Sequence, residues 1–325
     1  MKRSNARFVA GLLAITALVP LAWFVFLREP PPPPPAMPVV TTITADAGEP
    51  LPELKLTEVS GQVQVRHGLD GGWEDAKGGE VLAPNDGVRT ADGSYALLVG
   101  GEYWEVKMEP GTEVGLGELS ASISKLLLES GMAHARVHGA GRHTFEVHAA
   151  GSDAMATTDA GTFTVATNGH GTVALGTESG EVFFSGQGRV VIVRAGEASI
   201  VKPGAPPSAP VPVPRSLLLK VALPSRSTLN TRIITVAGNS EPGSLVEVQG
   251  HVVPTGADGT FTAKVTLKEG RNRVEVRSQG VGGTKNQSRH ELELDTTVNA
   301  PVIDPRSLWK EGLPTGRPSV QDAGE

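Results

Sequence analysis

Apolar and polar residues alternate in short runs through most of residues 56–203. Clear cases are residues 63–65 (VQV), 163–165 (FTV) and 190–193 (VVIV), and Gly, Asn or Asp separates such runs. Alternation with a period of two places successive side chains on opposite faces of a strand, and Gly, Asn and Asp are common turn formers. The pattern therefore predicts an all-β domain over residues 56–203.

One stretch of this region also has spacing compatible with a helix. Between residues 118 and 129, Leu119, Ile123 and Leu126 are three or four positions apart, as on one helical face. The run of three leucines at residues 126–128, followed by Ser130 and Gly131, suits a strand equally well. We favour a strand in the C-terminal half of this stretch.

Residues 216–296 show the same alternation, with turns such as residues 241–244 (EPGS) between the runs. About 80 residues with seven short strands at even spacing are typical of an Ig-like β-sandwich. Because the chain has no cysteine, hydrophobic burial alone would hold such a sandwich together. The predicted strands begin at Leu217, Ile233, Leu245, Val252, Thr260, Arg273 and Glu291.

The N-terminal region contains a long uncharged apolar run, residues 8–27, which begins with Phe8 and ends with Leu27. At about 1.5 Å per residue a helix of this length spans roughly 30 Å, enough to cross the hydrocarbon layer. Lys2, Arg3 and Arg7 precede it, so the positive-inside rule leaves the start of the chain in the cytoplasm. A cleaved signal peptide is the alternative, but the run is long for one and lacks a small-x-small ending.

Proline-rich segments mark the boundaries between these parts. Six consecutive prolines at residues 30–35 predict a stiff polyproline II spacer, and residues 204–215 (GAPPSAPVPVPR) form a second proline-rich stretch. The predicted organisation is a cytoplasmic stub and transmembrane anchor (1–28), a Pro-rich spacer (29–55), a first β domain (56–203), a Pro-rich linker (204–215), an Ig-like β-sandwich (216–296) and a disordered tail (297–325).

Composition and charge narrow the function classes. The absence of cysteine removes disulfides, thiolate metal sites and a cysteine nucleophile, and the net charge of -6 argues against a nucleic-acid binder. The charge is uneven, since residues 56–203 hold 10 Lys and Arg against 19 Asp and Glu, whereas residues 216–296 hold 10 against 8. The two domains are therefore expected to meet different partners.

A set of motifs across the first domain resembles a known family. Residues 59–65 (VSGQVQV) are followed by 85–90 (NDGVRT), 93–97 (GSYAL), 110–114 (PGTEV) and 161–165 (GTFTV) in that order. This succession resembles the FecR family of extracytoplasmic domains over nearly all of residues 56–203. The resemblance implies a β domain on the periplasmic side of the inner membrane. The second domain is similar to bacterial Ig-like modules.

The resemblance also implies a signalling role, which the sequence argues against. Founding FecR members relay an outer-membrane signal to a sigma factor through a folded cytoplasmic segment. Here seven residues precede the apolar run, with a reach of about 25 Å when extended, and they have no apolar face around which to fold. We therefore do not expect the sigma-regulating activity to accompany the exterior domain.

The sequence offers no positive evidence for an enzyme, a metal or a cofactor. It contains no Gly-x-Ser-x-Gly elbow, no His-Glu-x-x-His and no phosphate-binding Gly-x-x-x-x-Gly-Lys. A hairpin over residues 137–143 would bring His134 opposite Glu146, but one such pair is not a metal site. We expect the histidines of the first domain to be ordinary polar residues on a pair of strands, and zinc binding to be weak or absent.

One surface of the second domain is a candidate binding site. If residues 260–277 form a hairpin, the basic residues point outward and the inward set is Phe261, Ala263, Val265, Leu267, Val274 and Val276. Such a face would contact an anionic envelope polymer through charge-assisted hydrogen bonds. The alternative is an ordinary solvated sheet face. The candidate residues are Lys264, Lys268, Arg273 and Arg277.

Together these features predict a single-pass inner-membrane protein whose C-terminal part is periplasmic. Its expected function is non-catalytic: a tethered module that binds an envelope protein or an anionic envelope polymer. A FecR-type sensor or regulator acting through a membrane partner is one alternative. A carbohydrate-active hydrolase is another, and it would need a deep pocket with two acids about 5–10 Å apart.

Overall fold

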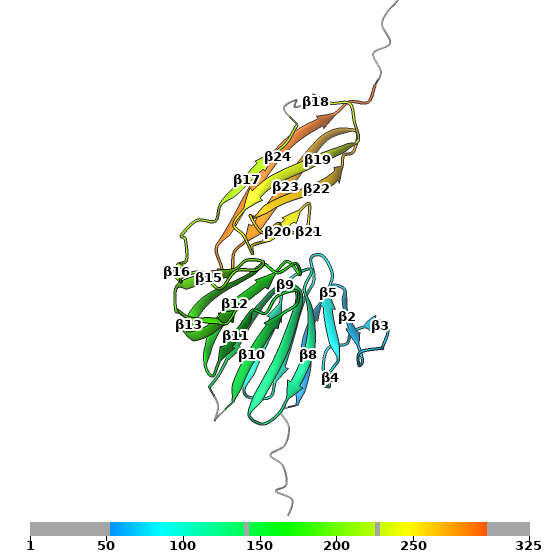
Figure 1. Cartoon of the computed structure of the whole chain (residues 1–325). Helices are drawn as coiled ribbons and strands as arrows, with labels where there is room; N and C mark the ends of the chain where they lie inside the picture. Colours follow the sequence, from blue (N-terminus) through cyan, green and yellow to red (C-terminus); the bar gives the residue numbers. More distant parts are fainter. Residues whose placement is uncertain (1–52, 140–142, 225–227, 298–325) are drawn as a thin grey trace, which may run out of the picture. The chain divides into compact units, whose positions relative to one another are not determined.

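A computed structural model describes residues 53–139, 143–224 and 228–297 of the chain. Within these ranges every regular element is a β-strand, which confirms the all-β expectation (Figure 1). The predicted anchor at residues 8–27, the proline spacer and the tail from residue 298 lie outside the described residues. Both β regions belong to one compact unit, Pro50–Glu325. We call them the first lobe and the second lobe.

The first lobe is built from sixteen strands that form a continuous hydrogen-bonded system. Their bounds are β1 Leu54–Ser60, β2 Val63–Arg66, β3 Trp73–Asp75, β4 Glu80–Leu82, β5 Gly87–Thr90, β6 Tyr95–Gly100, β7 Trp104–Met108, β8 Glu113–Leu119, β9 Ile123–Val137, β10 Thr144–Ala149, β11 Met155–Thr158, β12 Gly161–Thr167, β13 Val173–Gly186, β14 Arg189–Arg194, β15 Glu197–Val201 and β16 Val211–Pro212.

These strands form two sheets. Sheet A has the order β16-β15-β13-β12-β9-β7-β6-β1-β4. Sheet B has the order β14-β13-β11-β10-β9-β8-β5-β2-β3. Strands β8, β9, β10 and β11 can be followed side by side in Figure 1.

Two strands, β9 and β13, belong to both sheets. The first part of β9 pairs with β8 and β10 in sheet B, and the part from Gly131 onward pairs with β7 and β12 in sheet A. Gly131 has a φ of 90°, which permits the change of direction at little cost. In the same way β13 passes from sheet A to sheet B near Gly180, where φ is 77°. The two sheets are therefore covalently continuous.

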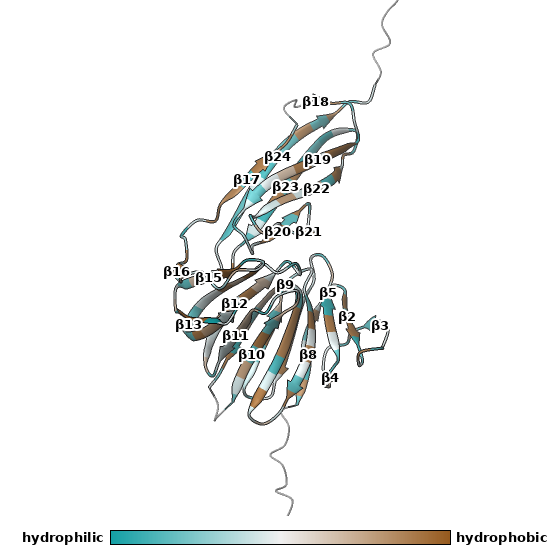
Figure 2. Cartoon of the chain, in the orientation of Figure 1, coloured by the Kyte–Doolittle hydropathy of each residue, from teal (hydrophilic) through white to brown (hydrophobic). Residues whose placement is uncertain are grey.

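The core of the first lobe fills the space between sheets A and B. Apolar side chains alternate inward along the strands, so polar and apolar residues are interleaved along them (Figure 2). Trp104, Phe145 and Phe163 are fully buried at its centre, with ring centroids 5.0 Å apart for the first pair and 6.3 Å for the second. Their packing joins β7 of sheet A and β10 of sheet B.

The proline-rich stretch of residues 204–215 is partly structured. Its β16 pairs with β15, and the Ser208 N–H donates to the Ile200 carbonyl oxygen at 2.9 Å. Proline lacks an N–H and is tolerated only at the edge of a sheet, which is where β16 lies. The predicted linker thus serves in part as an edge strand of sheet A.

The second lobe is a two-layered sandwich, as its turn spacing predicts. Sheet C has the order β17-β19-β22 and sheet D the order β18-β24-β23-β20-β21. The strand bounds are β17 Leu219–Ala222, β18 Thr228–Leu229, β19 Ile233–Ser240, β20 Leu245–Val248, β21 His251–Val253, β22 Thr260–Thr266, β23 Gly270–Gln279 and β24 Lys285–Leu294.

The core of the second lobe takes side chains from both of its sheets. Phe261 and Val265 of β22 in sheet C are buried together with Val274 and Val276 of β23 in sheet D. The alternation predicts all four to point inward, together with Leu267, which is also buried, and Ala263, which is only partly buried. Seven of the strands correspond to the predicted ones, with starts that agree within three residues except for β24, which begins at Lys285 and not at Glu291; the sequence does not predict β18.

The predicted hairpin over residues 137–143 is wrong. Strand β10 runs parallel to the first part of β9, with Glu146 opposite Lys125, whereas His134 lies in sheet A opposite Thr164. The chain therefore crosses from one sheet to the other after Val137 and does not turn back beside itself. The choice of a strand over a helix in residues 118–129 is confirmed, because β8 ends at Leu119 and β9 begins at Ile123.

Candidate interaction surface

The four predicted basic residues do not share one face. Lys264 is exposed on β22 of sheet C, whereas Arg273 and Arg277 are exposed on β23 of sheet D. Lys268 lies in the connection between the two strands. Residues 260–277 are not a hairpin within one sheet, because the chain passes between the two layers of the sandwich. The prediction that the four residues share one basic face is therefore wrong, although each of them is exposed as expected.

Acidic neighbours balance the two arginines on sheet D. Arg273 is opposite Glu291 in the ladder, and the Arg277 Nε lies 2.8 Å from a carboxylate oxygen of Glu275. Arg289 approaches the same Glu275 carboxylate at 3.8 Å. The outer face of sheet D thus carries neighbouring charges of both signs, an arrangement typical of a solvated sheet face.

The histidines of the first lobe are distributed and not clustered. The His134 Nδ1 lies 2.9 Å from Thr164 Oγ1 and 3.8 Å from a carboxylate oxygen of Glu178. The His148 Nε2 lies 3.2 Å from a carboxylate oxygen of Glu146. The predicted His134–Glu146 pair does not form, since these residues are in different sheets. No group of three or more His, Asp or Glu side chains suited to a metal ion occurs among the described residues.

Asp86 of the resemblance motif organises two turns. Its carboxylate accepts the backbone N–H of Gly68 at 2.8 Å and that of Ala83 at 2.9 Å, and it lies 3.2 Å from the His67 ring nitrogen Nδ1. Burial raises the pKa of this carboxyl, but the hydrogen bonds from Ala83, Gly68 and His67 outweigh it, so the pKa of Asp86 is lowered. This is a structural role, as the turn chemistry of residues 85–87 indicates.

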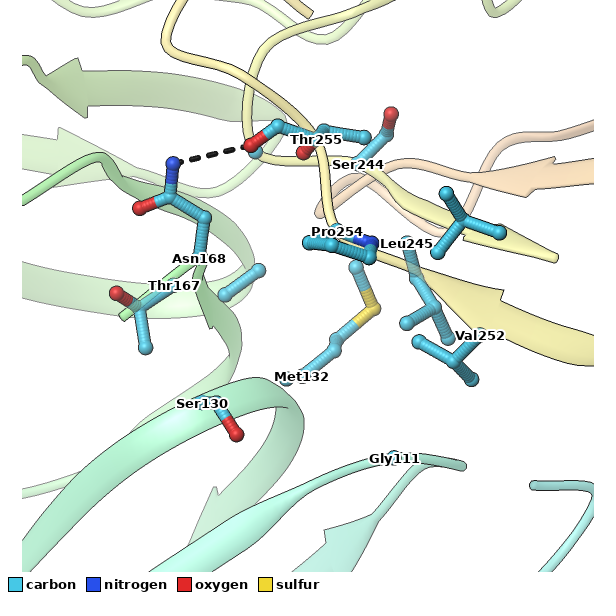
Figure 3. A pocket seen from close by; sticks show the side chains of 14 residues that line it. Gly111, Ser130, Met132, Thr167, Asn168, Ser244, Leu245, Val252, Pro254 and Thr255 are labelled. Atoms are coloured by element: carbon cyan, nitrogen blue, oxygen red, sulfur yellow. Dashed lines mark hydrogen bonds between the residues drawn. The ribbon is translucent and has the colours of Figure 1, made fainter. Parts of the chain in front are cut away.

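The lobes meet across a small apolar pocket of about 190 Å³. Met132 of β9 points toward Leu245 and Val252 of the second lobe, and the Asn168 side-chain amide donates to the Thr255 carbonyl oxygen at 3.0 Å (Figure 3). The Asp92 carboxylate adds two more bonds, since it accepts the Val252 N–H at 2.7 Å and the His251 Nδ1–H at 2.9 Å. The pocket is a packing gap within this contact, because its apolar lining belongs to the cluster that joins the lobes.

A second, polar pocket of about 580 Å³ lies beside the first. Arg277 and Lys285 line it together with the half-buried Glu247 and with Glu109 of the first lobe. Burial raises the pKa of Glu247, and the neighbouring Arg277 only partly offsets this effect. This pocket holds one of the four predicted basic residues, Arg277.

The clearest unusual surface lies on the solvent side of sheet B. Phe183 of β13 is 47% exposed and Val190 of β14 is 61% exposed. Ile192 is opposite Phe183 in the ladder, and Met155 and Val190 are both opposite Ser185, from its two sides. Side chains on one face of paired strands are about 5 Å apart, so the four lie around Ser185. We call Met155, Phe183, Val190 and Ile192 the outer apolar face.

Sequence reasoning missed this surface. The run at residues 182–184 (VFF) has apolar residues at three successive positions, so strict alternation is broken there, as it is at residues 190–193 (VVIV). Such runs suit a strand that is covered on both faces. The structure covers only one face, because Val182, Phe184 and Val193 are buried while Phe183 and Val190 are not.

Comparisons with known proteins bear mainly on the second lobe. Residues 219–296 match the family model of glucodextranase domain B. This match spans β17 to β24 and covers the second lobe only. No curated protein matches the chain.

Solved structures give only distant similarities. Two structures of a candidate anti-sigma factor from Parabacteroides distasonis are 18% and 19% identical, with a TM-score of 0.34 in each case. Each comparison covers 38% of this chain and 57% of the other, so the chain spans little more than half of those proteins. A polysaccharide lyase is 11% identical with a TM-score of 0.18, over 73% of this chain and 40% of the lyase. None of the described segments forms an apolar helix of membrane-spanning length.

Proposed function

We propose that this chain is a non-catalytic, membrane-tethered module that binds another protein of the cell envelope through the outer apolar face. The observation that carries the proposal is the exposure of Phe183 and Val190 side by side with Met155 and Ile192. Single exposed apolar residues are ordinary, but a contiguous group on a sheet face is typical of a surface that a partner covers.

The form of this surface favours a protein partner over a small molecule. The four side chains project from adjacent paired strands, and none of them lines either pocket described above. Small-molecule sites are concave and enclose most of their ligand, whereas protein interfaces have an apolar centre with a polar rim. The charged pair Glu181–Arg194, at 3.1 Å, borders the outer apolar face and supplies part of such a rim.

The proposed location rests on the sequence. The uncharged run at residues 8–27 would hold the chain in the inner membrane, and the proline segment would lift the lobes away from the bilayer. Protease added to spheroplasts tests this part. Digestion of both lobes is expected, and full protection of the lobes would overturn the periplasmic location.

Crosslinking in intact cells tests the binding role. A photoreactive amino acid at position 183 is expected to capture an envelope protein, and Phe183→Lys with Val190→Lys is expected to abolish capture from a probe at position 185. Ile233→Lys is the matched control, since Ile233 is also an exposed apolar residue, 62% exposed, but on the second lobe. An unchanged crosslinking pattern in the double variant would overturn the proposal.

A second candidate function is contact between the second lobe and an anionic envelope polymer. The polar pocket is the place for such a contact, because Arg277 and Lys285 line it together with the amide side chains of Gln279, Asn286 and Gln287. Glu109 and Glu247 line the same pocket, so the polymer would have to bind beside two carboxylates. Isolated peptidoglycan and lipopolysaccharide are suitable probes in a pull-down. Arg277→Gln with Lys285→Gln should lower retention, and equal retention of both forms would exclude this site.

A signalling role remains a third reading of the resemblance in the first lobe. It would need the same outer apolar face to bind a membrane partner whose state depends on an external signal. The crosslinking experiment identifies that partner directly. Capture of a receptor or a regulator would favour signalling over simple tethering.

A further inference from the structure

Strand β14 is an unusual edge. Sheet A ends at β4, which has three residues, and at β16, which has two and includes Pro212; sheet B ends at β3, also three residues long. These are the short or proline-containing edges by which proteins avoid unwanted strand pairing. The remaining edge of sheet B, β14, has six residues, RVVIVR, and no proline. Within the described residues β14 pairs only with β13.

Hydrogen bonds at the end of β14 show which backbone groups face outward. The Arg194 N–H donates to a Glu197 carboxylate oxygen at 3.0 Å, and the Glu181 carbonyl oxygen, opposite Arg194, accepts from Thr158 on the far side of β13. These two residues therefore form a pair whose backbone groups point away from each other. Because this alternates along antiparallel strands, the N–H and C=O groups of Ile192 and Val190 also point away from β13.

Both residues belong to the outer apolar face, where Val190 is 61% exposed and Ile192 is partly buried. Val190 and Ile192 therefore offer both unpaired backbone groups and apolar side chains, whereas Val193 between Ile192 and Arg194 is buried. An extended peptide laid along β14 would satisfy the backbone groups. Its alternate side chains would lie next to Val190 and Ile192 and extend the outer apolar face by one strand.

We propose that the partner contributes an extended segment that pairs with β14 as an additional strand of sheet B, and that this segment has apolar residues at alternate positions between acidic ends. This inference rests on the proposed protein-binding function and specifies its chemistry. The acidic ends follow from charge, because Arg189 and Arg194 bracket the four apolar residues of β14 and both are exposed. Arg194 uses its Nε for Glu181 on β13, at 3.1 Å, which leaves the other guanidinium nitrogens for the added strand. Opposite charges across paired strands stabilise the pairing.

The same charges argue against a second copy of this chain as the occupant. In a two-fold antiparallel β14–β14 pairing, opposite residues lie on the same face, so a register centred on Ile192 places each Arg194 opposite Val190 of the other copy. Such a pairing offers neither arginine of β14 an opposite charge on the added strand. A homodimer through β14 is therefore an outcome that the test must separate from the proposed one.

Fluorescence anisotropy with a labelled synthetic peptide tests the inference on the purified exterior part, residues 50–325, which form one compact unit. The probe is Ser-Glu-Thr-Val-Thr-Ile-Asp-Ser, blocked at both ends, whose acids are five positions apart, as Arg194 and Arg189 are in β14. Two control peptides carry Lys in place of the acids, or N-methyl groups on alternate backbone nitrogens of the pairing edge. Binding of the probe is expected, with affinity reduced at least about tenfold for each control.

Two variants of the protein locate the binding to the edge. Ile192→Pro removes an outward N–H without removing a bond to β13, and is expected to weaken binding about tenfold or more. Ile192→Thr keeps the N–H and should retain most of the binding. Should the proline variant unfold by circular dichroism, Val190→Lys provides a second test, because a lysine on an edge opposes strand addition.

Three results would overturn the inference. They are equal binding of the probe and the N-methylated peptide, unchanged binding by both Ile192→Pro and Val190→Lys, and concentration-dependent dimers in sedimentation that Ile192→Pro abolishes. If the cellular crosslinks from position 185 are lost in Phe183→Lys/Val190→Lys but persist in a folded Ile192→Pro variant, the edge inference fails while the proposed function stands. If the crosslinks persist in both, the proposed function fails as well.

Discussion

The indole ring of Trp104 lies directly against Gly100, its partner on the neighbouring strand β6. A methyl group added at Gly100 would come within 2.2 Å of Cε2 in the indole ring. Trp104 is fully buried and its ring contacts Phe145 of the opposite sheet. Gly100 therefore gives Trp104, the largest fully buried side chain among the described residues of the first lobe, the room to reach across the core.

Gly100→Ala should destabilise the first lobe by about 3 kcal/mol, because the indole would have to leave its packed position. Urea denaturation followed by tryptophan fluorescence measures the loss. Gly115→Ala is the matched control, since its methyl group would meet nothing closer than Leu127 Cβ at 3.8 Å. A cost for Gly100→Ala no larger than that of the control would refute the packing argument.

Asp86→Asn should lower the free energy of unfolding at pH 7 by about 2 kcal/mol, since the buried carboxylate accepts two backbone N–H groups and the His67 ring. The pKa of Asp86 is lowered in the folded state, so its contribution is complete above the ordinary value of 3.8 and is lost as the pH falls through the folded value. Urea midpoints of wild type and variant should therefore converge below pH 3.8. A constant gap down to pH 2 would contradict this.

The His67 ring should titrate above its ordinary pKa of 6.5, because hydrogen bonding to Asp86, and to a smaller extent the charges of Asp86 and Glu80, outweigh the effect of burial. Its stabilising effect is complete below 6.5 and disappears as the pH rises through the raised value. A proton NMR titration of the ring measures the pKa directly. The pKa should fall back toward 6.5 in Asp86→Asn, and an unaltered pKa in that variant would disprove the link.

Gly243→Ala should loosen the contact between the lobes. Its added methyl would lie 2.3 Å from Ala174 Cβ of the first lobe, whereas a methyl at Gly250 would meet nothing within 4 Å. Both glycines have a positive φ, 78° and 84°, so both substitutions strain the backbone and only the first disturbs the contact. Calorimetry should show the melting of the two lobes separating in Gly243→Ala but not in Gly250→Ala. Identical profiles would rule the effect out.

His143 should prove to be a structural histidine. Its Nδ1 is 3.0 Å from the Ala121 carbonyl oxygen, which can only accept, so Nδ1 carries the proton, and Nε2 is 3.0 Å from Ser124 Oγ. The ring also stacks on Tyr103 with centroids 4.3 Å apart. His143→Phe keeps the stacking but loses both bonds, at a cost of about 2 kcal/mol in thermal or urea unfolding. His148→Phe, at an exposed site, is the control and should be nearly neutral.

The alternation of residues predicts strands and buried faces well, but not which sheet a strand joins. Phe261, Val265, Val274 and Val276 are buried as expected, because the inward residues of a hairpin and of a chain that crosses between two layers are the same. The position of Lys264 relative to Arg273 differs between the two cases. That difference depends on pairing with β19 and β24, which are distant in the sequence.

Similar limits explain the errors around β9. Ser130 and Gly131 have the residue types of a turn, yet β9 continues through them because β8 pairs before this point and β12 after it. A positive φ at Gly131 signals a change of direction and does not say whether the strand ends. The sequence does not predict the exposure of Phe183 for the same reason, since the number of layers that cover a strand is a property of the whole fold.

The passage of β9 and β13 from one sheet to the other has a mechanical consequence. The layers of an ordinary sandwich are joined only by loops and packing, so they can part slightly to admit a guest. Here the backbones of β9 and β13 run through both layers. Separating the two layers would therefore break the interstrand hydrogen bonds of these strands. A segment that pairs with β14 would consequently bind a rigid edge. Almost all of the conformational entropy lost on association would then be lost by the incoming segment.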